Sequence, residues 1–183
     1  MKGFEAHTTL LPNTFILVRL DGKAFTQCAP PSPSFTQDHA FEKPNDLRAV
    51  LLMNECAAEV MRAYGDIFIA YGESDEFSFI FSRKCSLYSR RQEKIMSSRP
   101  ALSCLLSLPS SQPAHSFPAD VLSLFSSSYV FFWPKYFPDT PLKRPPSFDA
   151  RTVAYPSLKN VKDYLAWRQV GPASNELGRL PHQ

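Results

Sequence analysis

The sequence predicts a mixed α/β (α+β) domain of the ferredoxin-like type, with elements in the order βαββαβ. Three observations predict it. Short runs rich in β-branched and aromatic residues alternate with longer segments of helical periodicity. The second and third of these runs are separated only by a turn, as in a β-hairpin. The length of 183 residues suits one domain rather than two.

The first half of the chain supplies four elements. The apolar run 14–20 ends at Asp21-Gly22 and predicts a buried strand followed by a turn. Asn45-Asp46, preceded by a proline, predicts the start of a helix whose apolar residues recur at helical spacing up to Gly65. Two strands then follow, at 66–71 and 76–81, joined by a turn at Ser74-Asp75.

The second half is less regular. A basic helix is expected at 87–98, and the apolar segment 121–132 fits either a helix or a strand. The pattern at 148–155 predicts a strand, and a helix follows at 157–168. The tail 170–183 lacks apolar periodicity, so we expect it to be a divergent, frayed end.

Composition excludes several classes of protein. With 44% hydrophobic and 20% charged residues, the chain is expected to form a packed core. Its apolar runs are far shorter than the ~18 residues that a membrane span needs, and Pro12, Asn13 and Arg19 argue against a signal peptide. The four cysteines form no C-x-x-C pair, so zinc is not expected. We expect an intracellular protein of the cytoplasm, nucleus or mitochondrion, with no membrane partner and with reduced thiols.

Two segments interrupt the pattern. The 17 prolines are an excess, and they concentrate partly in 28–34 and 99–120. The first segment separates two copies of the triplet Phe-Thr-Gln, at 25–27 and 35–37. We expect both segments to be irregular insertions that contribute nothing to the core.

Acidic residues mark two predicted strand ends. Asp21 closes the first strand, and Asp75-Glu76 lies in the hairpin turn. In a ferredoxin-like sheet these ends can be neighbours, and two adjacent carboxylates repel unless a proton or a cation lies between them. Mg²⁺ prefers oxygen ligands and retains substrate phosphates. The alternative is an ordinary turn at Asp21-Gly22 and a capping role for Asp75. The net charge of +3 is too small to indicate nucleic acid by itself.

Several motifs, in the same order, resemble those of the tRNA-histidine guanylyltransferases. The resemblance extends from about residue 14 to residue 169. The motifs that carry it are Val-Arg-Leu-Asp-Gly-Lys at 18–23, His-Ala-Phe-Glu-Lys-Pro-Asn-Asp at 39–46, Ile-Ala-Tyr-Gly-Glu-Ser-Asp-Glu-Phe-Ser-Phe at 69–79, Arg90-Arg91 with Lys94, Ser-Ser-Tyr-Val-Phe at 127–131, Pro-Ser-Phe-Asp at 146–149 and Asp-Tyr-Leu-Ala-Trp-Arg-Gln at 163–169.

The resemblance implies a polymerase-palm-like catalytic domain spanning residues 1–169. The implied reaction adds a guanylate to the 5′ end of histidine tRNA. ATP first activates the tRNA 5′ phosphate, and the 3′ hydroxyl of GTP then attacks it. Two Mg²⁺ ions would assist the transfer. The implied partners are histidine tRNA, GTP, ATP and further copies of the chain, since the family assembles as tetramers.

The resemblance also implies roles for individual residues. Asp21 and Asp75 would be shared Mg²⁺ ligands with the Gly22 carbonyl, and Glu76 their acidic neighbour in the catalytic set. Arg91 and Lys94 would bind a triphosphate or tRNA phosphates, although a solvated helix face explains them too. Lys43 would reach phosphate, or it is a solvated loop lysine. The residues that would line the nucleotide are Asp21, Gly22, Lys23, Ala24, Phe25, Thr26, Ser74 and Asp75.

The chain departs from the family pattern in three places. Deleting 28–34 and 99–120 restores the family spacing, and after Gln169 the family's His-Ile-Asn-Asn-like segment is replaced by Val-Gly-Pro-Ala. The resemblance therefore implies a shortened chain with Mg²⁺-dependent GTP binding but little or no guanylate addition. Two alternatives stay open, namely a non-catalytic remnant that binds nucleotide or partner subunits, and another palm-type enzyme such as a nucleotidyl cyclase.

Overall fold

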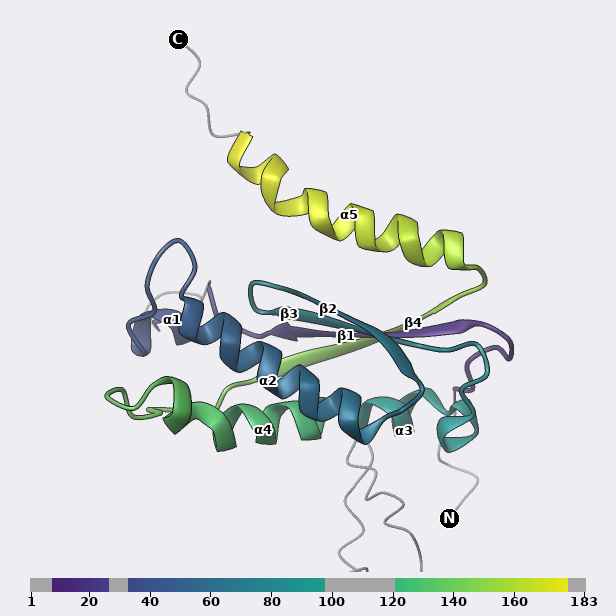
Figure 1. The fold of residues 1–183 in the computed structure, drawn as a ribbon, viewed down its shortest axis with the longest axis horizontal. Coiled ribbons are helices and arrows are strands. Elements are labelled where there is room, and N and C mark those ends of the chain that lie inside the picture. Colours follow the sequence, from purple (N-terminus) through teal and green to yellow (C-terminus); the bar gives the residue numbers. More distant parts are fainter. Residues whose placement is uncertain (1–7, 27–32, 98–120, 178–183) are drawn as a thin grey trace, which may run out of the picture.

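The computed structural model describes residues 8–26, 33–97 and 121–177 (Figure 1). Along the chain the elements are β1 (Phe15–Gly22), α1 (Phe35–Asp38), α2 (Leu47–Ala63), β2 (Ile67–Glu73), β3 (Glu76–Phe81), the short 3₁₀ turn η2 (Leu87–Arg90), α3 (Gln92–Ser97), α4 (Val121–Tyr136), β4 (Phe148–Tyr155) and α5 (Leu158–Leu177).

The four strands form one sheet in the order β2-β3-β1-β4, and every neighbouring pair is antiparallel. The central strand β1 pairs with β3 on one side and β4 on the other, so that Asp21 lies opposite both Glu76 and Asp149. This strand order, together with the long helices that follow β1 and β3, is the ferredoxin-like arrangement. The predicted fold class is therefore confirmed.

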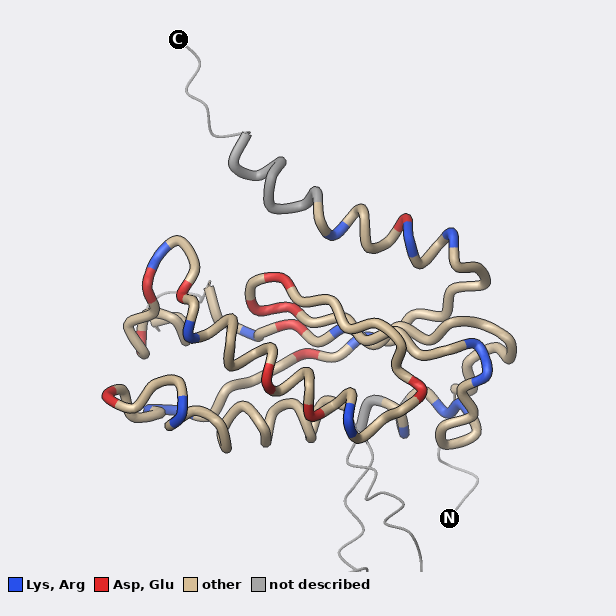
Figure 2. The backbone as a smooth tube through the Cα atoms, in the orientation of Figure 1, with Lys and Arg blue, Asp and Glu red and all other residues tan. Residues whose placement is uncertain are grey.

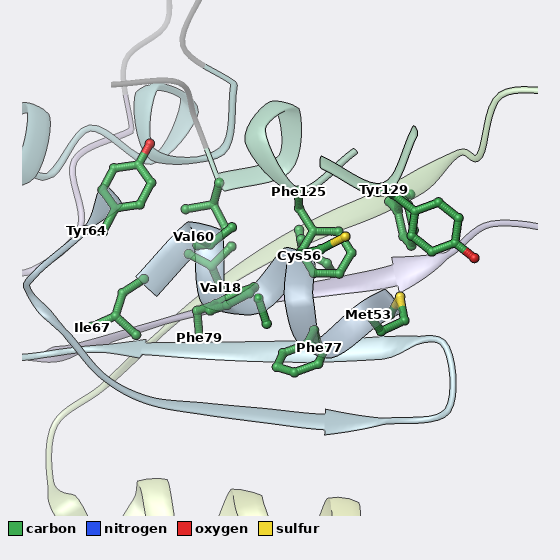
Figure 3. Packing of buried hydrophobic residues seen from close by; sticks show 14 of the residues in the cluster. Val18, Met53, Cys56, Val60, Tyr64, Ile67, Phe77, Phe79, Phe125 and Tyr129 are labelled. Carbon is green, nitrogen blue, oxygen red and sulfur yellow. The ribbon is translucent and has the colours of Figure 1, made fainter. Parts of the chain in front are cut away.

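Helices α2 and α4 lie side by side against one face of the sheet, and α5 covers the other face (Figure 1). The face under α2 and α4 carries the main core. Val18, Phe77 and Phe79 of the sheet meet Cys56 and Val60 of α2 and Phe125 of α4, with all of these side chains buried (Figure 3). Residues alternate between the two faces of a strand, which is why the residues on either side of Val18 point toward α5 instead.

The second face holds a much smaller cluster. Leu17, Ile80, Val161 and Tyr164 are buried there, and the Tyr164 hydroxyl makes a 2.8 Å hydrogen bond with Ser78 Oγ. Because Ser78 is itself fully buried, this bond satisfies a polar group that the helix would otherwise leave without a partner. Helix α5 is thus attached by a few specific contacts.

Two cysteines lie in the described residues, and both are free and buried. Burial raises the pKa of the Cys56 thiol to about 12 and also raises the pKa of Cys85. A thiol that stays protonated is a poor nucleophile and a poor metal ligand. The expectation that these two are inert, reduced thiols therefore stays a prediction, and their burial is compatible with it.

Two features differ from the sequence-based expectations, and one open alternative is decided. The basic helix predicted at 87–98 is broken, because Tyr88, Ser89 and Arg90 have left-handed backbone angles (φ of 50°, 54° and 60°) and α3 starts only at Gln92. The Arg90 side chain explains this turn. It is buried and donates hydrogen bonds to the carbonyl oxygens of Leu10, Cys85 and Thr14. The guanidinium thereby ties the segment before β1 to the turn.

The segment starting at Val121, for which helix and strand were both open, is the helix α4. Helix α5 continues to Leu177, past Gln169 where we expected the ordered domain to end. Ala173, Glu176 and Leu177 are good helix formers, which the tail's lack of apolar periodicity obscured. The segment 99–120 and the last residues, 178–183, lie outside the described residues.

Candidate functional site

The candidate site lies at the end of the sheet where β1 finishes and the β2–β3 hairpin turns. The Gly22 N–H donates a 3.0 Å hydrogen bond to the Asp75 carbonyl oxygen, which fixes the turn beside the end of β1. Asp21 is directly opposite Glu76 across the ladder. Figure 2 shows acidic residues gathered at this end of the sheet. The structure therefore brings together the two acidic sites that the sequence placed far apart along the chain.

Gly22 is at a close approach between three segments. A Cβ atom added there would lie 2.7 Å from the Phe25 ring and 3.0 Å from Asp75 Oδ2. Real Cβ atoms do not come as close as 2.7 Å to other atoms, so any larger residue would displace the Phe25 ring, and the Asp75 carboxylate would have to shift slightly as well. The Asp-Gly pair is thus required by packing at the site, beyond its suitability for a turn.

The three carboxylates at this end of the sheet lie on two sides of it. Asp21 and Glu76 are paired, so they share the face under α5. The Asp75 carboxylate instead lies at Gly22 and lines a pocket on the side of α2. A single cation that contacts both Asp21 and Asp75 would therefore have to lie at the rim of the sheet.

Electrostatics distinguishes Asp75 from Glu76. Burial, and then the nearby charge of Asp21, raise the pKa of the Asp75 carboxyl. Burial also raises the pKa of Glu76, but the positive charges of Arg168 and Arg19 oppose that rise. Glu76 is ion-paired with Arg168 of α5, and Arg19 Nε lies 3.6 Å from its Oε2 atom. Glu76 therefore links α5 to the sheet, and two arginines already balance the charge of its carboxylate.

Asp21 and Asp75 fit a divalent cation better than Glu76 does. Among the described residues, neither carboxylate forms a salt bridge with a lysine or arginine. No cluster of three or more His, Cys, Asp or Glu side chains suited to a metal occurs in the described part of the chain. Two carboxylates completed by carbonyl oxygens, water and phosphate are nevertheless ordinary Mg²⁺ ligands.

A pocket of about 270 Å³ opens beside Asp75. Aromatic and aliphatic side chains form part of its wall and polar groups the rest. This mixture suits a ligand with a flat apolar body and polar edges. Its lining residues are Phe25, Thr26, Thr36, Gln37, Ala40, Phe41, Glu42, Lys43, Pro44, Asn45, Asp46, Ala49, Val50, Met53, Ser74, Asp75 and Tyr129.

Four of the eight residues predicted to line a nucleotide form part of this pocket, namely Phe25, Thr26, Ser74 and Asp75. The other four, Asp21, Gly22, Lys23 and Ala24, lie next to Phe25 in the chain but do not line the pocket. Of these, Lys23 is exposed, and its N–H donates to the Ser147 carbonyl oxygen at 2.8 Å.

One wall of the pocket depends on a contact across the first insertion. The Phe35 N–H donates to the Ala24 carbonyl oxygen (2.9 Å) and the Thr36 N–H to the Phe25 carbonyl oxygen (3.1 Å), while the two phenylalanine rings stack at 4.5 Å. Ser34, which we expected to have no core role, is buried and caps α1 through a capping box. Most of the segment 28–34 lies outside the described residues.

The second wall is the start of α2. Asp46 is the N-cap, and its carboxylate accepts hydrogen bonds from the N–H groups of Arg48 (2.9 Å) and Glu42 (3.0 Å). The Arg48 guanidinium also contacts both carboxylate oxygens, and its hydrogen bond is the main reason that the pKa of Asp46 is lowered. Lys43 is exposed at the mouth of the pocket, within the same lining as Asp75.

Arg91 and Lys94 lie elsewhere. Arg91 pairs with Thr9 in an isolated bridge, and its guanidinium donates to the Tyr88 carbonyl oxygen. Both residues follow the end of β3 that pairs with the start of β1, at the opposite end of the sheet from Asp75. The structure therefore does not bring these two residues to the pocket.

Sequence reasoning missed most of the pocket wall. The His-Ala-Phe-Glu-Lys-Pro-Asn-Asp motif supplies seven lining residues, from Ala40 to Asp46, of which we had singled out only Lys43. The available signal was the motif itself, because a run of eight residues that resembles the family pattern indicates a functional segment rather than a single functional lysine. Tyr129 belongs to the Ser-Ser-Tyr-Val-Phe motif at 127–131, but the motif did not indicate that this residue would line the pocket, since α4 is a distant segment that reaches the pocket only through tertiary packing.

Comparisons with known proteins identify a family. The profile of the tRNAHis guanylyltransferase family matches residues 1–108 and 114–156. The tRNA(His) guanylyltransferase of Neurospora crassa is 44% identical over 179 residues, covering 97% of this chain and 51% of that protein. That of Schizosaccharomyces pombe is 44% identical over 177 residues, covering 97% and 56%.

Solved structures point the same way. The crystal structure of the Saccharomyces cerevisiae tRNA(His) guanylyltransferase superposes with a TM-score of 0.73 at 40% identity, covering 92% of this chain and 62% of that one. A bacterial guanylyltransferase-like protein in complex with GTP has a TM-score of 0.67 at 19% identity, covering 94% and 68%, and supports the fold alone.

The fold and the acidic strand ends define a ferredoxin-like α+β domain with a candidate acidic site at one end of its sheet. The match over most of the chain is more specific, and the chain belongs to the tRNAHis guanylyltransferase family. It spans about half the length of the curated relatives it matches. Within the described residues, no helix is both long and apolar enough to cross a membrane.

Proposed function

We propose that this chain binds a guanine nucleotide with Mg²⁺ at the Asp21–Asp75 end of the sheet and serves the addition of a guanylate to the 5′ end of histidine tRNA. The observation that carries the proposal is the location of the pocket. It opens beside Asp75, a carboxylate that forms no salt bridge with a described lysine or arginine and whose pKa is raised by burial and by the charge of Asp21.

The pocket suits a nucleoside. Its wall includes the aromatic side chains of Phe25 and Tyr129 and the aliphatic side chains of Val50 and Met53, an apolar lining that suits a flat base. Polar groups at the rim, from Asn45 and Ser74, are available to hydrogen-bond the base or the sugar. The triphosphate would then extend toward Asp21 and Asp75, with Lys43 at the mouth to offset its charge.

Asp21 and Asp75 would hold two Mg²⁺ ions, aided by the Gly22 carbonyl oxygen. When bound, such ions stabilise the charge that develops on an attacking and on a leaving oxygen. The protein's own contribution is orientation. Gly22 lets Asp75 lie against the end of β1, and the Gly22–Asp75 hydrogen bond fixes the turn that carries the carboxylate. A rigid site of this kind lowers the barrier by holding the reacting groups in line.

In the proposed reaction the 5′ phosphate of histidine tRNA takes an adenylyl group from ATP with release of pyrophosphate, and the 3′ hydroxyl of GTP then attacks that phosphate and displaces AMP. The distance of Arg91 and Lys94 from the pocket favours tRNA phosphates over the triphosphate as their ligand. Glu76 acts through its ion pairs, by keeping α5 on the sheet beside Asp21. Assembly into a tetramer is part of the same proposal.

Calorimetric titration with GTP tests the site directly. We expect binding that needs Mg²⁺ and that is weakened at least tenfold by Asp75→Asn, because one metal ligand loses its charge. Arg91→Ala is the matched control, since it removes a charge far from the pocket. Labelled guanylate in histidine tRNA that depends on Mg²⁺ and Asp75 would extend the result to the whole reaction. Binding that is unaffected by Mg²⁺ and by Asp75→Asn would refute the proposal.

A further inference from the structure

The Tyr129 hydroxyl is a buried polar group without a partner. Tyr129 is 0% exposed, and among the described residues its hydroxyl oxygen has no hydrogen-bond partner. Burying a hydroxyl without a partner is unfavourable, and the great majority of buried polar groups are paired. A phenylalanine would fill the same space without that penalty, and this chain uses 15 phenylalanines elsewhere.

The tyrosine ring is firmly held in place. It packs against the rings of Phe148 (5.5 Å between centroids), Trp133 (5.9 Å), Phe25 (6.1 Å) and Phe35 (6.2 Å). Close packing of this kind leaves the ring no room to turn its hydroxyl toward another protein group. The hydroxyl therefore points in one direction.

That direction is toward the nucleotide site. Tyr129 lines the pocket together with Asp75 and Met53. Figure 3 shows the hydroxyl pointing toward the end of the sheet where the β2–β3 hairpin turns. Met53 is a flexible side chain at the same wall, so it can give way as a ligand enters. Burial, with the nearby charges of Cys56, Asp75 and Asp46, raises the pKa of Tyr129, so the hydroxyl keeps its proton and remains a donor.

We propose that Tyr129 is a nucleotide-binding residue whose hydroxyl donates a hydrogen bond to an acceptor atom of the bound guanine nucleoside. This inference rests on the proposed function and adds a contact from α4 to it. It explains why a tyrosine occupies this place in the core. The hydroxyl is unsatisfied in the free protein and gains its partner only from the ligand, so it contributes to affinity at the expense of stability.

Two tyrosine variants make the test. Tyr129→Phe removes the unpaired hydroxyl at the pocket, and Tyr164→Phe removes a hydroxyl that bonds Ser78 on the opposite face of the sheet. For Tyr129→Phe we expect about tenfold weaker Mg²⁺-dependent GTP binding by calorimetry, the effect of one lost hydrogen bond, with a Tm that is unchanged or higher. For Tyr164→Phe we expect a lower Tm and unchanged affinity for GTP.

The outcomes separate this inference from the proposed function. Absence of Mg²⁺-dependent GTP binding by the unmodified chain overturns both. Binding by the unmodified chain that Tyr129→Phe leaves unchanged overturns only the role of Tyr129. A Tyr129→Phe variant with a lowered Tm would also overturn it, since the hydroxyl would then be supporting the fold.

Discussion

The two faces of the sheet are built very differently. Among the residues whose side chains the structure describes, the face under α2 and α4 belongs to a cluster of 24 buried hydrophobic residues, whereas the cluster under α5 has four. On the α5 side, Trp167 is 61% exposed, and Val153, which pairs with the buried Leu17, is 39% exposed. Helix α5 depends instead on two polar links, Tyr164 with Ser78 and Arg168 with Glu76.

The difference shows which part of the domain supports the candidate site. The pocket is built entirely on the well-packed face, where Phe25 and Tyr129 belong both to the core cluster and to the pocket wall. Rigid packing around a site fixes its geometry, because core side chains have few alternative positions. The site should therefore tolerate changes under α5 much better than changes under α2 and α4.

The largest expected effect is a cavity in the main core. Phe125 is fully buried and contacts the rings of Phe148 (5.2 Å), Phe77 (6.0 Å) and Phe79 (6.2 Å). Phe125→Ala should lower the free energy of unfolding by about 3–5 kcal/mol. Urea denaturation measures this, and nucleotide binding should fall with it. A loss under about 1 kcal/mol would show that this face is not close-packed.

The matched change on the other face is Val161→Ala. Val161 is also 0% exposed, but the cluster around it is small. Losing two methyl groups should cost about 1.6 kcal/mol, and affinity for Mg²⁺·GTP should stay within a factor of about two, since the pocket is on the far side of the sheet. An equal loss of affinity in both core variants would contradict the claim that the site depends on the face under α2 and α4 and not on the face under α5.

The next prediction concerns the first insertion. The hydrogen bonds from the N–H groups of Phe35 and Thr36 to the carbonyl oxygens of Ala24 and Phe25 join residues eleven positions apart. Deleting the seven residues 28–34 leaves the same partners four apart, which is the α-helical spacing. The deletion should therefore yield one continuous helix and raise the Tm by about 2 °C through a shorter loop. A lowered Tm would mean that the Ser34 capping box contributes more to the stability of the fold than the longer loop costs in conformational entropy.

The smallest expected effect is electrostatic. Burial and the charge of Asp21 raise the pKa of Asp75 above its ordinary value of 3.8. The folded state then holds this proton more tightly than the unfolded state, so the contribution to stability is full below pH 3.8 and is lost as the pH rises through the folded pKa. In metal-free buffer, Asp75→Asn should raise the Tm by about 1–2 °C at neutral pH, and the gain should shrink on acidification. A constant gain at every pH would contradict the assignment.

Local patterns predicted much of the fold. The β-branched run ending at Asp21-Gly22 and the helix opened by Asp46 could be predicted because propensity, capping and tertiary packing agree there. The turn at Tyr88–Arg90 could not, since its backbone is held by the bonds of a buried arginine to carbonyl groups around residues 10 and 14. Helix α4 was ambiguous because it is apolar on most sides, which removes the periodicity that separates helix from strand.

The sequence predicted the acidic residues of the candidate site and a few residues of the pocket wall, namely Phe25, Thr26, Ser74 and Lys43. Asp21 and Asp75 follow from strand ends that meet in a ferredoxin-like sheet. Tyr129 lies more than 50 residues from Asp75 in the chain and reaches the pocket only through tertiary packing. Arg91 was expected near phosphate because of its charge, but charge alone does not show at which end of the sheet a side chain lies.

The central claim is that the nucleotide binds at the Asp21–Asp75 end of the sheet, on the well-packed face. Hydrogen–deuterium exchange of the chain with and without Mg²⁺·GTP tests it most directly. The account predicts slower exchange at 22–26, 40–46 and 74–75, with no change along 158–168. Protection confined to β4 and α5, with the three pocket segments unchanged, would contradict it.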